Sequence, residues 1–276
     1  MPAQDASRLA GVPLAWPALV TNMGGCINTS AMIESLIDHP HIQLRTDAEV
    51  AAITPTQTTA TVELQSGPED YDAVVLATGG ADPLSEGFGV CDVERIRGQV
   101  TLVDGKAFKG QRRLLCFKGY LTRANDAGQH VTGASFDHAG DPHDREPIDA
   151  SDAENLERLN AVLPGSYRSS GGWVGWRRVA RDRLPLVGPL PDYAWFRDSL
   201  GPWTQGGAPG PCPAPRYVPG VWLSLAHASR GTGTAIICGE LVAAGITGDA
   251  LPLPTPLVHA LHPARFVIRA LKSHQA

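Results

Sequence analysis

The segment Gly172-Trp-Val-Gly-Trp-Arg-Arg-Val-Ala-Arg-Asp-Arg-Leu-Pro-Leu-Val-Gly188 places four arginines within seven residues, at positions 177, 178, 181 and 183. The whole chain is acidic, with a formal net charge of −5, so this basic cluster is local. A guanidinium binds carboxylate or phosphate through a planar fork of N–H donors and also stacks on aromatic rings. We interpret the segment as a strand that carries an anion-binding arginine into a pocket. Solvated arginines at a strand edge account for the pattern equally well.

The composition is that of an ordinary globular protein of one large or two modest domains: 276 residues, 43% hydrophobic and 18% charged. No run of about 18 apolar residues predicts a membrane span, and the N-terminus lacks a signal-peptide pattern. Five scattered cysteines without a Cys-x-x-Cys motif favour reduced thiols in the cytoplasm. The acidic, histidine-containing stretch 137–149 meets no metal-ligand spacing, so we expect a solvated loop and no metal site.

Two strand ends are candidates for ligand binding. Residues 71–80 form the clearest strand, and the apolar run 73–77 predicts burial on both faces before the exit Thr78-Gly79-Gly80. Residues 221–225 predict a second strand, which a glycine-rich turn at 226–233 joins to an apolar helix. Ligands gather at the carboxyl ends of parallel strands, and a helix N-terminus attracts anions. Tight packing turns explain both glycine pairs as well.

Several stretches resemble one family. Val74–Gly79 resembles a cofactor-side strand of the FAD-dependent amine oxidases related to D-amino-acid oxidase, and Gly175–Gly188 resembles their substrate-arginine strand. More narrowly, further pieces look like the oxidoreductase half of the bifunctional tRNA 5-methylaminomethyl-2-thiouridine biosynthesis proteins. These pieces are Arg97–Val100, Cys116–Thr122, Gly133–Phe136, Pro191–Tyr193, Ala228–Gly231 and His262–Leu271. Their order and spacing hold from about Gly24 to Lys272.

The resemblance implies an α/β (α+β) fold with two parts. One is a layered FAD-binding sheet, formed here by residues 24–80 and 221–276, in which the first βαβ unit with its glycine loop is missing. The other is an antiparallel substrate domain, residues 81–197, with expected strands at 97–103, 113–118 and 130–135. Residues 198–220 are rich in glycine and proline and predict an irregular insertion.

The resemblance also implies a reaction. The family uses FAD to remove the carboxymethyl group from a carboxymethylaminomethyl uridine at the tRNA wobble position, with glyoxylate as the second product. Arg177 falls on the position of the family's substrate arginine, and Tyr120 is the second catalytic candidate, with a core position as its alternative. Strand neighbours alternate faces, so Arg177 and Arg178 cannot both face a flavin. The expected FAD-binding residues are Val50, Thr78, Gly79, Ser229, Arg230, Gly231, Thr232 and Gly233.

The partners implied are tRNA and a methyltransferase domain or protein that acts on the aminomethyl product. We expect tRNA phosphates to meet a basic patch of Arg178, Arg181 and Arg183. A short basic helix at 262–272 is expected to present Arg265 and Arg269 on the surface. We expect a cytoplasmic protein without membrane contact.

Two other functions remain open. A small-molecule oxidase of the glycine or sarcosine type would use the same fold and the same arginine, so fold alone does not separate it from a tRNA-modifying enzyme. A non-catalytic remnant is the third reading, because the sequence contains no Gly-x-Gly-x-x-Gly turn of the kind that holds the FAD pyrophosphate. Ala228 also stands where the family commonly has glycine.

The missing glycine turn gives a direct prediction about the cofactor. The purified chain mixed with FAD should retain little flavin after gel filtration, because the main pyrophosphate contact is absent from the sequence. Absorption of the protein fraction in the flavin band measures the retained amount. Stoichiometric flavin with a shifted band would contradict the prediction.

Overall fold

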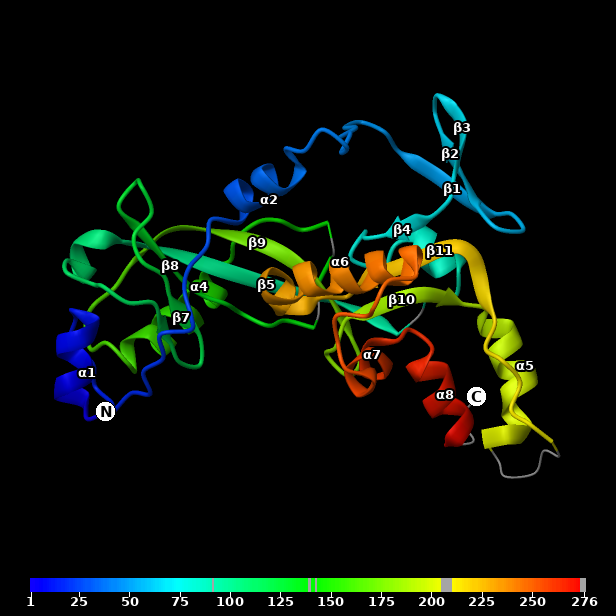
Figure 1. Cartoon of the computed structure of the whole chain (residues 1–276). Coiled ribbons are helices and arrows are strands. Elements are labelled where there is room, and N and C mark those ends of the chain that lie inside the picture. The colour runs from blue at the N-terminus through cyan, green and yellow to red at the C-terminus, as the bar shows by residue number, and fades with distance from the viewer. Residues whose placement is uncertain (91, 139, 142, 205–209, 274–276) are drawn as a thin grey trace. The chain divides into compact units, whose positions relative to one another are not determined.

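The computed structural model describes residues 1–90, 92–138, 140–141, 143–204 and 210–273 (Figure 1). The chain forms two compact units: the first contains Met1–Ile42 and Ile96–Trp176, and the second contains Gln43–Arg95 and Arg177–Ala276. Two long strands, β5 (Val93–Asp104) and β9 (Ser169–Ala180), contribute residues to both. These boundaries differ from the two domains drawn from the sequence, and that functional division stays a prediction.

The first unit is built on a five-stranded sheet of order β6-β7-β8-β5-β9. Its three short strands are β6 (Leu115–Cys116), β7 (Tyr120–Leu121) and β8 (Gln129–Gly133), and the pairs from β6 to β5 are antiparallel. The helices are α1 (Ala3–Ala10), α2 (Thr29–Ile37) and α4 (Asp149–Asn160), with a 3-10 turn η1 (Gly105–Phe108). Phe108, Leu121 and Leu159 are almost fully buried in its core, so the expected antiparallel sheet is confirmed.

Helix α4 is fixed to strand β5 by a buried polar network. Gln99 Nε2 and Thr101 Oγ1 each donate a hydrogen bond of 2.7 Å to Asp152 Oδ1, and Asn155 Nδ2 donates to the Gln99 carbonyl at 3.0 Å. Arg97, 4% exposed, donates to Gln99 Oε1. Buried polar groups of this kind favour one arrangement, since any other leaves donors and acceptors unpaired. The network therefore fixes how α4 lies on the sheet.

The second unit contains two three-stranded sheets. One has the order β10 (Leu186–Pro191), β11 (Tyr217–Leu225), β4 (Val74–Leu76), and its β11–β4 pair is parallel. The other is an antiparallel meander of β1 (Val50–Pro55), β2 (Ala60–Leu64) and β3 (Gly67–Tyr71). The helices are α3 (Pro83–Gly87), α5 (Tyr193–Thr204), α6 (Gly231–Thr247), α7 (Thr255–Leu261) and α8 (Arg265–Lys272), with a 3-10 turn η2 (Ala228–Arg230).

Helix α6 covers the β10–β11 part of the sheet, as Figure 1 shows. Its buried Cys238, Leu241 and Val242 pack with Val187 of β10 and Trp222 of β11. On the described part of the chain, no helix is long and apolar enough to cross a bilayer.

Strand β4 differs from its sequence prediction. It lies at the edge of its sheet, and Val75 is 41% exposed, so the expected burial on both faces is wrong. An apolar run signals burial only when a neighbour covers each face, and β4 pairs with β11 alone.

The segment 198–220 is also more regular than predicted. Helix α5 continues through residues 198–204, and β11 begins at Tyr217, while residues 205–209 lie outside the described part. Phe196, 2% exposed, anchors α5, and α5 packs against α8. Packing of this anchor outweighs the low helix propensity of the glycines and prolines that follow.

Asp182 is the electrostatic centre of the second unit. Its carboxylate accepts two hydrogen bonds of 2.9 Å from Arg265 and one of 2.7 Å from Arg269. Burial alone would raise the pKa of Asp182, but these arginines and the Leu184 backbone N–H outweigh it and hold the pKa well below its usual value. Arg265 is 6% exposed, so its predicted surface position is wrong: the ion pair draws it inside.

Replacing Asp182 with alanine should lower the free energy of unfolding by about 3 kcal/mol, because it leaves the buried Arg265 without its carboxylate. Urea unfolding at neutral pH measures the change. The wild-type contribution is present above about pH 4, the ordinary pKa of an unfolded aspartate, and is lost as the pH falls toward the lower folded value. The control Asp5→Ala removes the exposed pair with Arg8 and should change stability by less than about 0.5 kcal/mol. Equal losses in both variants would contradict the role assigned to Asp182.

Candidate functional site

The carboxyl ends of the parallel strands β4 and β11 lie side by side. The loop after β4 holds Thr78, Gly79 and Gly80, and the loop after β11 leads through His227 to helix α6. A backbone hydrogen bond of 2.9 Å from Ala226 N–H to the Gly79 carbonyl joins the two loops. Loops at such strand ends are the usual ligand position of open α/β sheets. The structure therefore brings together the two glycine turns that the sequence separates by about 150 positions.

These two loops hold an unusual concentration of left-handed backbone. Gly79 and Gly80 have φ of 90° and 91°, and the alanines Ala81, Ala226 and Ala228 have φ of 54°, 58° and 54°. An alanine in this region costs roughly 1–2 kcal/mol relative to the right-handed conformation. Such backbone persists where surrounding contacts impose it, and it clusters at ligand-binding loops.

Strand β9 brings its arginines to the same place. Val179 forms an isolated antiparallel bridge with His227, and the aliphatic part of Arg178 packs on Gly79. A Cβ atom at Gly79 would lie 3.1 Å from Arg178 Cγ, so both the φ angle and this contact favour glycine there. Arg178, rather than Arg177, is thus the arginine that contacts the glycine turn. Arg177, also half-buried, points to the other face of the strand, as alternation requires.

The N-terminus of helix α6 opens the loop to a ligand. The helix begins at Gly231, and no side chain caps its first backbone N–H groups. A Cβ atom at Gly233 would meet no other atom within 4 Å, so the backbone there is open to close approach. Uncapped N–H groups and the helix dipole favour an anion such as a phosphate.

His227 links the strand, the loop and the helix. Its Nδ1 lies 2.8 Å from Thr234 Oγ1, and its Nε2 lies 3.1 Å from Ser224 Oγ. Thr234 donates its hydroxyl proton to the Arg230 carbonyl, so its oxygen accepts from Nδ1–H and Ser224 donates to Nε2. Burial lowers the pKa of His227, so the ring is neutral at pH 7 and holds the loop in place. The sequence suggested only Ser229 as a partner of this histidine. The alternation of Ser224 along β11 was the available signal.

The remaining candidate residues have separate positions. Thr78 is exposed, and its hydroxyl donates a hydrogen bond of 2.6 Å to Asp82. Ser229 and Arg230 are exposed on η2, and Thr232 is exposed in the first turn of α6. Val50 is the first residue of β1. Tyr120 is half-buried in β7 of the first unit, apart in the chain's division from the residues above, which belong to the second unit.

Comparison with known proteins gives one family match. The model of the family described as FAD dependent oxidoreductase matches residues 2–244. The chain is 32% identical over 279 residues to the tRNA 5-methylaminomethyl-2-thiouridine biosynthesis bifunctional protein MnmC of Chromobacterium violaceum, covering 96% of this chain and 42% of that protein. The chain thus spans about two fifths of the length of this relative.

Two solved structures share the fold. The glycine oxidase from Geobacillus kaustophilus superposes with a TM-score of 0.62 at 18% identity, covering 81% of this chain and 54% of its own. The L-proline dehydrogenase from P. horikoshii gives a TM-score of 0.62 at 19% identity, covering 82% and 55%.

The left-handed alanine at position 228 can be tested by substitution. Ala228→Gly should raise the free energy of unfolding by about 0.5–1 kcal/mol, because glycine adopts φ of 54° without steric cost. The matched control Ala243→Gly changes an exposed alanine inside helix α6 and should destabilise by about 1 kcal/mol. Urea unfolding of the three proteins measures both. Destabilisation by both substitutions would argue against strain at Ala228.

Proposed function

Because the chain belongs to the FAD dependent oxidoreductase family, we propose that it carries out the oxidative step of tRNA wobble-uridine modification. This step removes the carboxymethyl group from carboxymethylaminomethyl(2-thio)uridine and leaves aminomethyl(2-thio)uridine. The observation that carries the proposal is the 32% identity along 96% of the chain to a protein named for 5-methylaminomethyl-2-thiouridine biosynthesis. The chain spans 42% of that protein, so its whole activity enters here as a proposal.

The loops at the β4 and β11 ends fit one wall of an FAD site. Open backbone at Gly231 and Gly233, the uncapped start of α6 and the glycine turn at Gly79 suit a phosphate or a flat ring that approaches the main chain closely. Thr78, Ser229, Arg230 and Thr232 would line the same wall, with Val50 as a further contact. Bound FAD supplies the acceptor for a hydride from the carbon next to the amine nitrogen.

Arg177 is proposed to hold the substrate carboxylate. A carboxymethyl group ends in a carboxylate, and a half-buried guanidinium binds it through two parallel N–H bonds more strongly than an exposed cation would. That contact orients the methylene carbon for hydride loss. Tyr120 is proposed as the second group at the reacting end of the substrate.

The tRNA itself is proposed to meet Arg178, Arg181 and Arg183. Arg181 and Arg183 are exposed beside the turn that follows β9, where their positive charge can neutralise RNA phosphates. Arg178 is half-buried against Gly79, so it would act nearer the cofactor wall than the surface. The aminomethyl product is a primary amine, and a methyltransferase domain or protein is proposed to consume it.

An amine oxidase for free glycine-like substrates is the second candidate. Its support is the shared fold with a glycine oxidase, at an identity that speaks for fold alone. A small substrate needs the carboxylate-binding arginine but no RNA surface, so the two functions separate by substrate.

The test measures glyoxylate release with FAD supplied, from tRNA carrying the carboxymethylaminomethyl group and from free glycine. We expect release from tRNA, and Arg177→Gln should lower kcat/KM about a hundredfold, since a charged hydrogen-bond pair to the substrate is lost. The control Arg45→Gln breaks an exposed pair with Glu69 and should leave the rate within about twofold.

Release from glycine alone would favour the small-molecule oxidase. Retained flavin without release from either substrate would favour a non-catalytic chain. Equal rates for the wild type and Arg177→Gln would remove Arg177 from the proposed site.

A further inference from the structure

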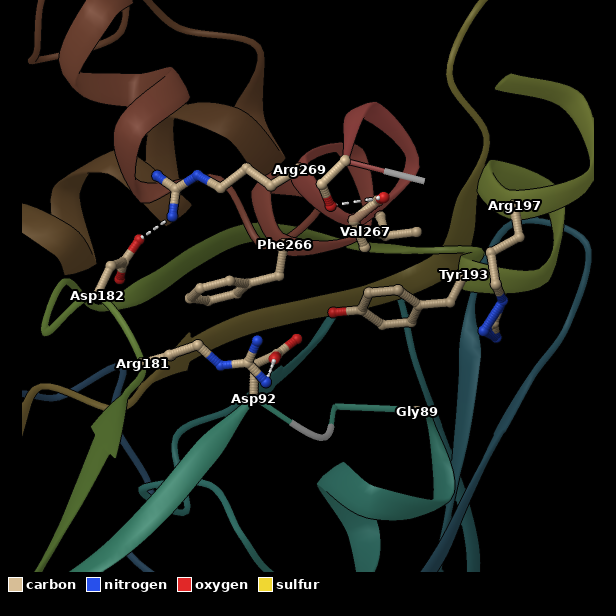
Figure 2. Close-up of a pocket in the computed structure, with 11 residues that line it drawn as sticks. Gly89, Asp92, Arg181, Asp182, Tyr193, Arg197, Phe266, Val267 and Arg269 are labelled. Atoms are coloured by element: carbon tan, nitrogen blue, oxygen red, sulfur yellow. Dashed lines mark hydrogen bonds and ion pairs between the residues drawn. The ribbon is translucent and has the colours of Figure 1, made fainter. Parts of the chain in front are cut away.

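A second hollow in the same unit lies away from the candidate cofactor wall. It has a volume of about 560 Å³, within the range of small-molecule sites. Residues from the β9–β10 turn, α5, α8 and the segment before β5 line it, and Figure 2 shows them. None of Thr78, Gly79 and residues 229–233 is among its lining residues. The function proposed above therefore does not use this hollow.

Three arginines give the hollow its charge. Arg181 contacts Asp92 at 3.0 Å, and Arg269 contacts Asp182 at 2.7 Å, with side chains that remain 75% and 55% exposed. Each guanidinium carries five N–H donors, so one carboxylate contact leaves several for another acceptor. Arg197 is exposed on α5, and no ion pair is recorded for it among the described residues. Three cations against two carboxylates leave the hollow with a surplus positive charge.

The rest of the lining suits more than a bare anion. Tyr193 packs on Gly89, which has φ of 82°, and Figure 2 shows its hydroxyl directed toward the space between Phe266 and Arg181. This tyrosine supplies a ring edge and a hydroxyl beside the arginines. The oxygens of Asp92 and Asp182 can accept hydrogen bonds from hydroxyl or amino groups. A ligand that carries both an anion and such donors matches this lining.

We infer that this hollow binds a phosphorylated nucleotide unit, with its phosphate on Arg181, Arg197 and Arg269 and its ribose or base beside Tyr193 and Asp92. Arginine forks match phosphate oxygens, and a nucleotide carries the ribose hydroxyls and base amino groups that the carboxylates can accept. The inference rests on the proposed function for the source of the nucleotide, which is then an unpaired part of the tRNA. It adds Arg197 and Arg269 to the proposed RNA contacts.

The test is a fluorescence titration of labelled tRNA with the whole chain and three variants. Arg197→Gln should weaken binding about fivefold and make the slope of log K against log salt shallower by about 0.9, as for one lost phosphate contact. Asp92→Asn removes a competing negative charge and should tighten binding about threefold. The control Arg123→Gln makes the same charge change at an exposed residue outside the hollow and should stay within about twofold.

The outcomes separate this inference from the proposed function. Equal weakening by Arg197→Gln and Arg123→Gln would overturn the hollow while leaving tRNA as a partner. Competition by 5′-AMP, lost in Arg197→Gln, without any tRNA binding would support the hollow for a free nucleotide and contradict the tRNA function. Binding of neither tRNA nor 5′-AMP by the wild-type chain would overturn the inference. Arg197 is exposed, so circular dichroism should show an unchanged fold in its variant.

Discussion

The hydrogen bond between Ala226 N–H and the Gly79 carbonyl, 2.9 Å long, holds together the ends of the two parallel strands. The rest of the candidate site depends on it, because it places the β4 turn, the His227 loop and the start of α6 against one another. Left-handed alanines on both sides of the bond, Ala81 and Ala226, indicate that tertiary contacts impose this geometry on the chain. The site is therefore formed by backbone and helix ends more than by a cluster of side chains.

Asp182 links this site to the rest of the second unit. It follows β9, which carries Arg177 and Arg178, and it binds Arg265 and Arg269 of α8. The same arrangement leaves Arg181 and Arg269 partly free of their carboxylates at the rim of the nucleotide hollow. One aspartate thus stabilises the turn after the arginine strand and shapes the neighbouring surface.

The sequence was most informative where a pattern is local. The strand 221–225, the glycine turn after it and the following apolar helix all appear in the structure, since strand alternation and helix propensity act over a few residues. It failed where burial depends on a distant partner: Val75 is exposed because β4 is an edge strand, and Arg265 is buried because Asp182 binds it. The helix α5 was missed because its anchor, Phe196, packs against elements far along the chain.

The sequence by itself determined the family, the cofactor class and the segment that carries the arginines, because these are written in the order and spacing of motifs. Only the tertiary structure decided which arginine contacts the glycine turn, since Arg177 and Arg178 are chemically identical and differ only in the face of the strand that each occupies. The pairing of β4 with β11, and of Asp182 with α8, likewise joins residues far apart in the chain. No local pattern encodes such contacts, because they form only when the packed elements meet.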